Sequence, residues 1–151
     1  MAVSDDIIVM NNAEIAQMGT PSELYEAPSS AFIADFIGDA NLAICEVEET
    51  GECFAKVRLA NHLYEVPNKG MTKGPAQMVL RPHDITLSAP ENSVLKGEVT
   101  YAAYLGKEIQ YTVESEIGSL FIVGSVASNP FRKGQTVGIH LNEQQARLVS
   151  A

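Results

Sequence analysis

Four consecutive residues of this sequence, Arg81, Pro82, His83 and Asp84, have the types and spacing best suited to chemistry. They place a cation, a rigid proline, an imidazole and a carboxylate side by side. Proline fixes the backbone, and arginine can hold a carboxylate through a forked pair of donors. The run therefore predicts either a rigid strand junction with a buried ion pair or a contact for a ligand or partner. We expect the structural role.

Motifs of known catalytic sites do not accompany this run. A phosphate-binding P-loop requires GxxxxGK[ST], whereas the pair Gly106-Lys107 is followed by Glu108. The sequence also lacks GxSxG and HExxH. The three histidines are far apart and without a local partner pattern, which favours strand or surface positions over metal ligation: they are His62, His83 and His140. We therefore expect that this chain is not an enzyme by itself and holds no cofactor and no metal.

The densest acidic run lies between the two cysteines and comprises Glu46, Glu48, Glu49 and Glu52. A hard cation prefers such oxygen ligands, but no EF-hand spacing accompanies the run, so we expect a solvated hairpin edge. Cys45 and Cys53 could face each other across that hairpin. In a cytoplasmic protein they are expected to stay reduced. Because they form no CxxC motif, they are expected to be buried small residues rather than a redox or metal pair.

The composition limits the size of the fold and the class of its partners. With 151 residues, 46% of them hydrophobic, the chain can form one compact domain plus an appendage. The net charge is −9, and eleven of the nineteen acidic residues precede Lys56, the first basic residue. Nucleic-acid affinity comes largely from Lys and Arg, so this balance argues against a nucleic-acid partner.

No segment of the sequence is suited to crossing or entering a membrane. The longest apolar stretch, 120–127, is far shorter than the roughly 20 residues that a transmembrane helix needs. The N-terminal residues MAVSDD have neither a basic segment nor an apolar one, so no secretory signal is recognisable. The cytoplasm is the expected compartment.

The first 40 residues predict a hairpin and two short helices. Segments 6–10 and 14–18 read as two strands joined by a tight turn, and their apolar residues need a sheet that the following sequence does not supply. Thr20, Pro21 and Glu23 form the start of a helix with a capping box, which extends to about residue 26.

A second predicted helix spans 31–37, with Ser29 or Ser30 as its N-cap and Gly38 as its C-cap. Its apolar residues form one stripe at helical spacing, which predicts packing against a core in the barrel or in a domain upstream. This stripe consists of Phe32, Ile33, Phe36 and Ile37.

From residue 41 onward the hydrophobic period changes from helical to two, which predicts many short strands and a β-barrel or sandwich. Gly106, between two long strands, is expected to occupy a tight turn with positive φ. The predicted strands are 42–47, 53–59, 62–66, 77–81, 85–88, 95–105, 108–114, 119–123, 136–141 and 146–149.

Several of these segments together resemble the C-terminal part of ABC-importer ATP-binding subunits. Segments 3–11, 15–28 and 32–38, followed by Asn41, closely resemble the end of the ATPase domain in that family. Segment 80–85 is similar to the Arg-Pro-Glu motif of its transport-associated OB domain, and Tyr104-Leu105-Gly106 to the strand-turn signature of that domain.

The resemblance implies a mainly β fold with two parts. Residues 1–40 would be the tail of the ATPase domain and a linker helix, and residues 41–151 would be an OB-like barrel of regulatory function. The Walker motifs, the signature motif and the catalytic histidine would lie upstream of Met1. Within the barrel, it suggests structural or regulatory roles for Arg81, Pro82, His83, Asp84, Leu105 and Gly106. In the linker, residues that would pack on the ATPase domain are Phe32, Ile33, Phe36, Ile37 and Gly38.

The resemblance also implies partners and a location. They are the ATPase domain of the same subunit with its ATP and magnesium, a second copy of the subunit, and a membrane permease at the cytoplasmic face of the inner membrane. The cargo would be a small solute, namely iron(III) or another ion, a phosphonate, a polyamine or a sugar, and the compact barrel favours the iron(III) or phosphonate branch.

Two residues depart from the family pattern. Ala13 replaces a turn glycine, which leaves the hairpin turn type open, and His83 replaces a glutamate, which weakens an ion-pair role and suggests sensitivity to pH.

Two alternatives remain at this point. One is a free-standing barrel that binds a small ligand such as an oxyanion, and the other is an acidic enzyme of unknown type. A free-standing binding protein has no use for the unfinished hairpin and the Gly-Thr-Pro helix start, and ATPase activity of the purified chain would contradict the regulatory interpretation.

Overall fold

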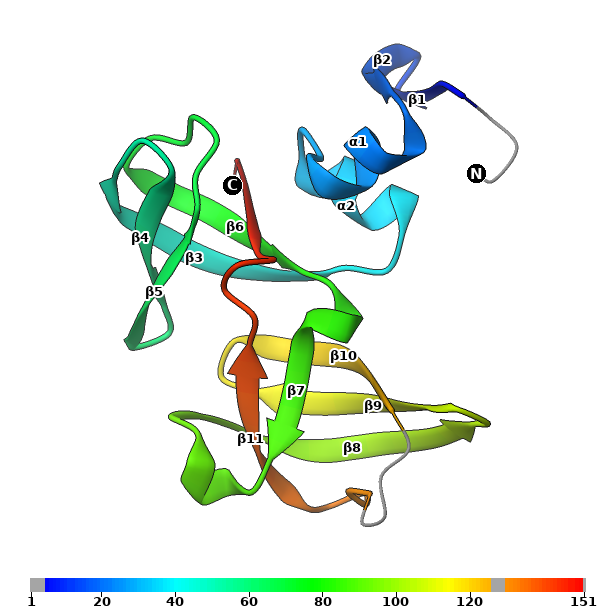
Figure 1. Cartoon of the computed structure of the whole chain (residues 1–151), viewed down its shortest axis with the longest axis vertical. Coiled ribbons are helices and arrows are strands. Elements are labelled where there is room, and N and C mark those ends of the chain that lie inside the picture. The colour runs from blue at the N-terminus through cyan, green and yellow to red at the C-terminus, as the bar shows by residue number, and fades with distance from the viewer. Residues whose placement is uncertain (1–4, 126–129, 151) are drawn as a thin grey trace.

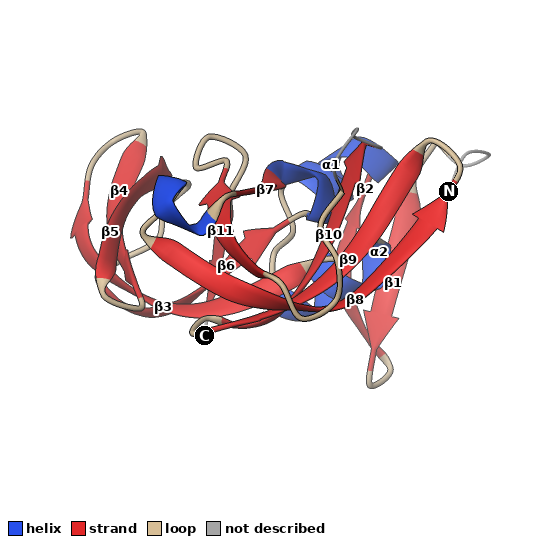
Figure 2. Ribbon diagram, turned by 90° about the horizontal axis from the view of Figure 1, so that it is seen from below, coloured by secondary structure: helices blue, strands red, loops and turns tan. Residues whose placement is uncertain are grey.

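The computed structural model describes residues 5–125 and 130–150, and strands dominate it (Figures 1 and 2). An N-terminal hairpin and two short helices lie beside two five-stranded antiparallel sheets. Among the described residues, no helix is long and apolar enough to cross a lipid bilayer.

The N-terminal elements follow the sequence pattern closely. They are β1 (Ile7–Asn11), β2 (Glu14–Gly19), α1 (Pro21–Glu26) and α2 (Ala31–Ile37). The predicted capping box is confirmed, because the Thr20 hydroxyl accepts from the Glu23 amide and the Glu23 carboxylate accepts from the Thr20 amide. The Ser30 hydroxyl likewise caps α2. Gly38 occupies the C-cap, but with φ −173° it is extended, so α2 does not end in a left-handed glycine.

The hairpin packs one face on the helices. Val9 is buried against Leu24 and Ile33, and Ile7 packs beside them. The two strands alone are marginal in water, so this contact with the helices holds them in place. The opposite face of the hairpin is apolar and exposed, and it is described with the functional site below.

The hairpin turn adopts the conformation that glycine favours although glycine is absent. Asn12 and Ala13 have φ of 51° and 64°, and Asn11 pairs with Glu14 across the two-residue turn, as in a type I′ turn. Asparagine tolerates this region, whereas alanine is strained there by about 1 kcal/mol or more.

We therefore expect Ala13→Gly to raise the free energy of unfolding by about 0.5–1 kcal/mol, because the relief of strain exceeds the added entropy of the unfolded chain. Urea denaturation measures this change. Ala16→Gly, the same replacement inside β2, is the control and should lower stability by a similar amount. Equal effects of the two replacements would contradict a strained turn.

Two antiparallel sheets contain the remaining strands. One has the order β12-β6-β3-β4-β5, formed by Arg147–Ser150, Gly74–Leu80, Asn41–Thr50, Phe54–Leu59 and His62–Pro67. The other has the order β10-β9-β8-β11-β7, formed by Gly118–Ser125, Glu108–Ser115, Leu95–Leu105, Thr136–Leu141 and Ile85–Ser88. Two short 3-10 helices flank β7, namely η1 (Pro82–Asp84) and η2 (Pro90–Asn92).

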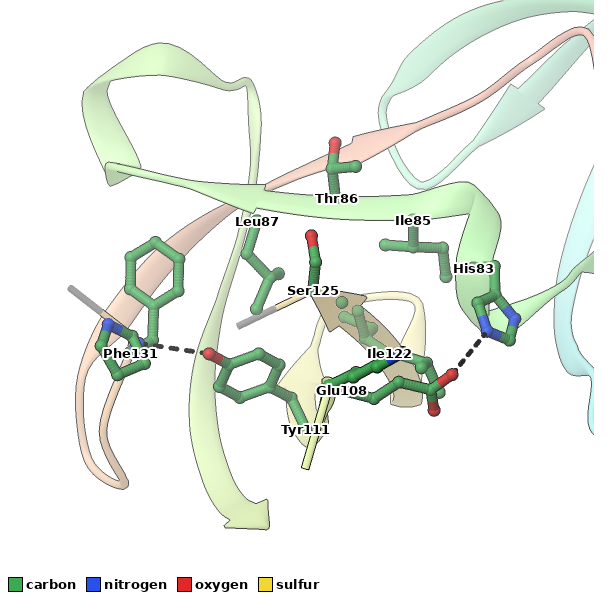
Figure 3. A pocket seen from close by; sticks show the side chains of 13 residues that line it. His83, Ile85, Thr86, Leu87, Glu108, Tyr111, Ile122, Ser125 and Phe131 are labelled. Carbon is green, nitrogen blue, oxygen red and sulfur yellow. Dashed lines mark hydrogen bonds and ion pairs between the residues drawn. The ribbon is translucent and has the colours of Figure 1, made fainter. Parts of the chain in front are cut away.

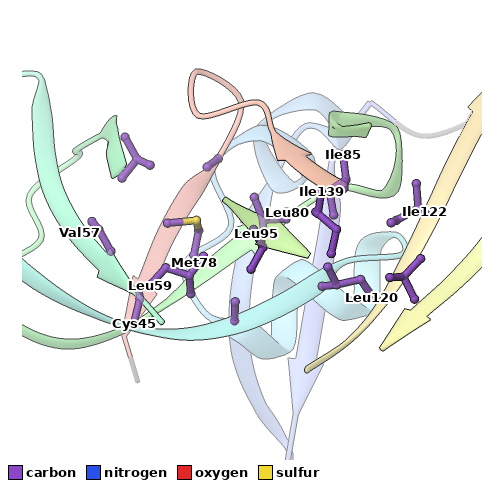
Figure 4. Close-up of a cluster of buried hydrophobic side chains, with 14 of the residues drawn as sticks. Cys45, Val57, Leu59, Met78, Leu80, Ile85, Leu95, Leu120, Ile122 and Ile139 are labelled. Atoms are coloured by element: carbon purple, nitrogen blue, oxygen red, sulfur yellow. The ribbon is translucent and has the colours of Figure 1, made fainter. Parts of the chain in front are cut away.

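A single hydrophobic core joins the two sheets (Figure 4). Its buried side chains come from all the strands of 41–141, including Met78 of β6, Leu95 of β8 and Ile139 of β11. The strands alternate buried and exposed residues, as β4 does over its whole length. The domain boundary after residue 40 stays a prediction, because α2 and β6 also share a small cluster of Ala34, Val79 and Val149.

The observed strands agree with the predicted ones to within a few residues, and three of them (85–88, 95–105 and 136–141) have the predicted bounds. The chief differences are that β3 extends to Thr50 and that β6 starts at Gly74 and ends before Arg81. Gly106 has φ 73° in the two-residue turn between β8 and β9, as predicted.

Candidate functional site

Arg81 lies at the junction between the sheets and the N-terminal helices. It follows β6 directly, and only 6% of its surface is exposed. Its Nη1 donates to three carbonyl oxygens, those of Ala34 at 2.8 Å, Gly38 at 3.0 Å and Asp39 at 3.2 Å. Its Nη2 donates to the carbonyl oxygen of Tyr25 at 3.0 Å. One side chain therefore satisfies the carbonyl groups at the ends of both helices.

The surroundings of the Arg81 guanidinium are those of a structural tie. It stacks 4.1 Å from the centre of the Tyr25 ring, and burial lowers its pKa below the ordinary value. The expected buried ion pair is wrong, because none of the salt bridges in residues 5–125 and 130–150 includes Arg81. The planar fork binds backbone carbonyls instead. Gly38 is not required for space here, since a Cβ on it would lie 3.4 Å from the Tyr25 ring, an ordinary van der Waals contact.

The other residues of the run face different surroundings. Pro82 is buried at the first position of η1. His83 is largely exposed, with its Nε2 3.9 Å from a carboxylate oxygen of Glu108. Asp84 is half-buried, and burial raises its pKa, while its backbone carbonyl accepts a hydrogen bond from the amide of Asn142. Arg81 thus donates its hydrogen bonds to the helices, and the positive charges of His83, Arg147 and Arg81 act against the effect of burial on the pKa of Asp84.

Asn41 is a second tie at the same junction, and the sequence did not single it out as a site residue. It is the first residue of β3, with 6% of its surface exposed. Its side-chain amide donates to the Phe121 carbonyl at 2.8 Å and accepts from the Phe121 amide at 2.8 Å. It therefore pairs with the edge of β10 as a neighbouring strand would. The available signal was a polar side chain at a buried position of an alternating strand.

The apolar stripe of α2 is divided between buried and exposed positions. Ile33 is fully buried under the hairpin, and Ile37 packs beside it. Phe32 and Phe36 instead stack on each other with their centroids 5.6 Å apart, and Phe36 is 64% exposed. Phe36 therefore packs on no core among the described residues, and its predicted packing against a domain upstream stays a prediction.

The free face of the hairpin adds to this exposed apolar surface. Ile8 pairs with Met18 and Met10 pairs with Ile15 across the two strands, and all four are more than half exposed. Leu105, at the tip of the β8-β9 hairpin, is also more than half exposed. The four residues of the N-terminal hairpin form one exposed apolar face, and such a face usually marks a contact with another protein surface.

The remaining candidate residues do not converge. Among the described residues, no group of three or more His, Cys, Asp or Glu could hold a metal ion. His140 forms a 2.7 Å hydrogen bond with the Ser88 hydroxyl. In the acidic run, Glu48 and Glu49 pair with Arg58 and Lys56 across β3 and β4.

The two cysteines differ in exposure. Both are free, and they do not face each other as the hairpin interpretation suggested: Cys45 pairs with Ala76 of β6, whereas Cys53 precedes β4. Cys45 is buried, and burial raises the pKa of its thiol to about 11. Cys53 is exposed, so the expectation that both cysteines are buried is wrong for Cys53.

We therefore expect a disulfide reagent such as Ellman's to modify one thiol of the native chain at pH 8 and two thiols in denaturant, because only exposed thiolates react. Absorbance of the released thiolate measures both numbers. Cys53→Ser should remove the native reaction, and rapid reaction of the native variant would contradict the burial of Cys45.

Comparison with known proteins gives this geometry a family context. Residues 78–149 match the TOBE domain family. The chain is 43% identical over 152 residues to the Fe(3+) ions import ATP-binding protein of Agrobacterium fabrum, which covers 100% of the chain and 43% of that protein. It is 40% identical over 150 residues to the Fe(3+) ions import ATP-binding protein of Rhizobium meliloti, covering 99% of the chain and 42% of that protein.

A further relative has another cargo in its name. The chain is 37% identical over 125 residues to the spermidine/putrescine import ATP-binding protein of Clostridioides difficile, covering 82% of the chain and 34% of that protein. The chain thus spans less than half the length of these relatives.

Among solved structures, the cytoplasmic molybdate-binding protein ModG has a similar fold, with a TM-score of 0.62 at 12% identity, covering 74% of this chain and 96% of that one. This likeness confirms the predicted mainly β, OB-like fold class. The sequence and the fold agree: residues 78–149 are a TOBE domain, and the whole chain corresponds to the C-terminal part of the ATP-binding subunits of ABC importers.

Proposed function

We propose that this chain is the regulatory and dimerisation region of an ATP-binding subunit that drives import of iron(III). The support for the cargo is the 40–43% identity to iron(III) importers along the whole chain, against 37% over a shorter segment to the spermidine relative. ATP and magnesium would bind in the part of the subunit that this chain does not contain.

The observation that carries the regulatory role is the tie formed by Arg81. It fixes the ends of α1 and α2 to the end of β6 through four hydrogen bonds of 2.8–3.2 Å. Arg147 of β12 adds a 2.9 Å bond to the Glu26 carbonyl. A displacement of the barrel would therefore move the two helices and the hairpin with it.

The exposed apolar residues of the hairpin and of α2 support a covering domain. The faces that carry Met18 and Phe36 are apolar and largely exposed. In the proposed subunit the ATPase domain covers them, so the tie at Arg81 links the barrel to the ATPase. The further partners in this proposal are a second copy of the subunit and a membrane permease, which place it at the cytoplasmic face of the inner membrane.

The free-standing oxyanion-binding module receives less support. It rests on a likeness to ModG at 12% identity, which concerns the fold alone. A hollow of about 610 Å³ beside β7 is lined mainly by apolar side chains, whereas an oxyanion requires several converging donors.

A chimera tests the proposed function. This chain replaces the matching C-terminal 43% of the Agrobacterium subunit in cells that lack that subunit, and uptake of radioactive iron(III) is measured. The matching segment of the spermidine relative serves as the comparison. We expect this chain to restore more uptake than that segment. A chimera that hydrolyses ATP but imports no iron would contradict the proposal.

A further inference from the structure

A cleft of about 610 Å³ opens beside β7, on the side away from β11 (Figure 3). Its walls are apolar, with Ile85 and Leu87 of β7 facing Ile122 of β10, and Tyr111 and Phe131 closing one end. The two rings meet edge to face at 6.3 Å. A hollow of this volume is within the range of known ligand pockets.

The strand that borders the cleft directs some of its backbone groups away from its sheet partner. β7 is an edge strand whose sheet partner is β11, and the Asn142 amide donates to the Asp84 carbonyl just before the pair Ile85–Leu141. Hydrogen-bonded and non-hydrogen-bonded pairs alternate in an antiparallel ladder. The N–H and C=O groups of Thr86 therefore point to β11, and those of Ile85 and Leu87 point to the open side, where the cleft lies.

On the other side of the cleft, the edge of β10 is satisfied in part by a side chain. Asn41 pairs with both backbone groups of Phe121. By the same alternation, the backbone groups of Val123 and Ser125 point to the same edge as those of Phe121, beyond the reach of Asn41. Both walls of the cleft thus offer backbone donors and acceptors above an apolar floor.

The charge at the rim is partly compensated. His83 and Glu108 lie 3.9 Å apart, whereas none of the ion pairs found in residues 5–125 and 130–150 includes Lys107, which also lines the cleft. The rim therefore has one cation available for a ligand carboxylate.

We propose that this cleft binds an extended peptide segment of a partner protein by strand addition to the edge of β7. The peptide backbone pairs with Ile85 and Leu87, an apolar side chain enters the cleft between Leu87 and Ile122, and a neighbouring carboxylate lies near Lys107. Strand addition combines backbone hydrogen bonds for affinity with a pocket for alternate side chains for specificity. The proposal rests on the cleft alone and holds whether or not the barrel is linked to an ATPase.

The chain offers a replacement that fills the cleft and a matched control. Gly124 lines the cleft, pairs with Ile109 on the inward face, and has no atom within 4 Å of the position of an added Cβ. Gly124→Phe should place a ring in the cleft and leave the fold intact. Ser119, on the same strand, is exposed and pairs with Glu114 on the outer face, so Ser119→Phe adds the same ring away from the cleft.

The test titrates a peptide into the chain and monitors the NMR shifts of the backbone amides. Two capped hexapeptides serve as probes: acetyl-Thr-Leu-Thr-Phe-Thr-Glu-amide and acetyl-Glu-Thr-Leu-Thr-Phe-Thr-amide. We expect saturable shifts in β7 and at the cleft. Gly124→Phe and N-methylation of the peptide leucine should each raise the dissociation constant about tenfold or more. Ser119→Phe should leave the dissociation constant within about twofold of that of the original chain. Lys107→Glu should weaken binding about fivefold, and Lys96→Glu, away from the cleft, should not.

Three results would overturn the proposal. One is the absence of saturable shifts with either peptide at millimolar concentration. Another is equal binding of the N-methylated peptide, which would indicate a small apolar ligand rather than strand addition. The third is a dimer of the unaltered chain in light scattering that Gly124→Phe converts to a monomer, because a second copy would then occupy the cleft. Dispersed spectra of both phenylalanine variants confirm that they fold.

Discussion

Arg81→Met is expected to lower the free energy of unfolding by about 3 kcal/mol. The replacement removes four hydrogen bonds of a buried charged donor and leaves the carbonyl groups of the helix ends without that donor. Methionine retains most of the apolar stem, so the loss of packing is small. Urea denaturation measures the change. In addition, amide hydrogen exchange should become faster in α1 and α2 than in the sheets, because the tie joins these helices to β6.

Arg58→Met is the control for this prediction. Arg58 is exposed and forms an ion pair with Glu48 on the sheet surface, where solvent screens the charges, so its replacement should lower stability much less than Arg81→Met does. Arg81→Lys should fall between the two, since one ammonium group cannot donate in the geometry of a fork. If Arg81→Met and Arg58→Met had equal effects, the guanidinium would not hold the helices to the barrel.

Asn41→Leu is the second replacement with a large expected effect. It removes both hydrogen bonds to the backbone of Phe121 and leaves a part-buried amide and carbonyl unpaired, at a cost of about 2–3 kcal/mol. Leucine has a similar volume, so the effect reports the polar contact rather than a cavity. Thermal and urea denaturation measure the loss.

Asn92→Leu provides the matching control, because Asn92 is exposed in η2 and its replacement should change stability by less than about 0.5 kcal/mol. Asn41→Asp is a second comparison. It retains the acceptor for the Phe121 amide but loses the donor to the carbonyl while ionised, so it should be destabilised at neutral pH and regain stability as the pH falls and the carboxyl group protonates. Stability that is independent of pH for this variant would contradict the pairing.

The local structure of this chain could be predicted because it depends on neighbours in the sequence. Thr20 and Glu23 are three residues apart, and that spacing alone sets the capping box. The alternation of apolar and polar residues in 95–105 and 136–141 predicted strands with the observed bounds. Gly106 marked a turn, because few other residues adopt its conformation without strain.

The partners of the site residues could not be predicted in the same way. Arg81 was recognised as a candidate, but its acceptors lie 42 to 56 residues away and are backbone carbonyls, which carry no mark in the sequence. The run of Arg81 suggested a buried ion pair, which is not among the salt bridges of the described residues. For Asn41 the partner is 80 residues distant. The stripe of α2 also left open whether Phe36 is covered, because a helical stripe shows which residues share a face and not how much of that face is covered.

The sequence by itself determined the elements, their order and the family, because capping, turn conformation and hydrophobic period are short-range properties of the chain. Only the tertiary structure decided that Arg81 ties the linker helices to the barrel, that Asn41 pairs with the edge of β10, and that β7 borders a cleft. Each of these depends on which distant segments meet, and the pairing order β10-β9-β8-β11-β7 follows from burying the shared core rather than from any local pattern.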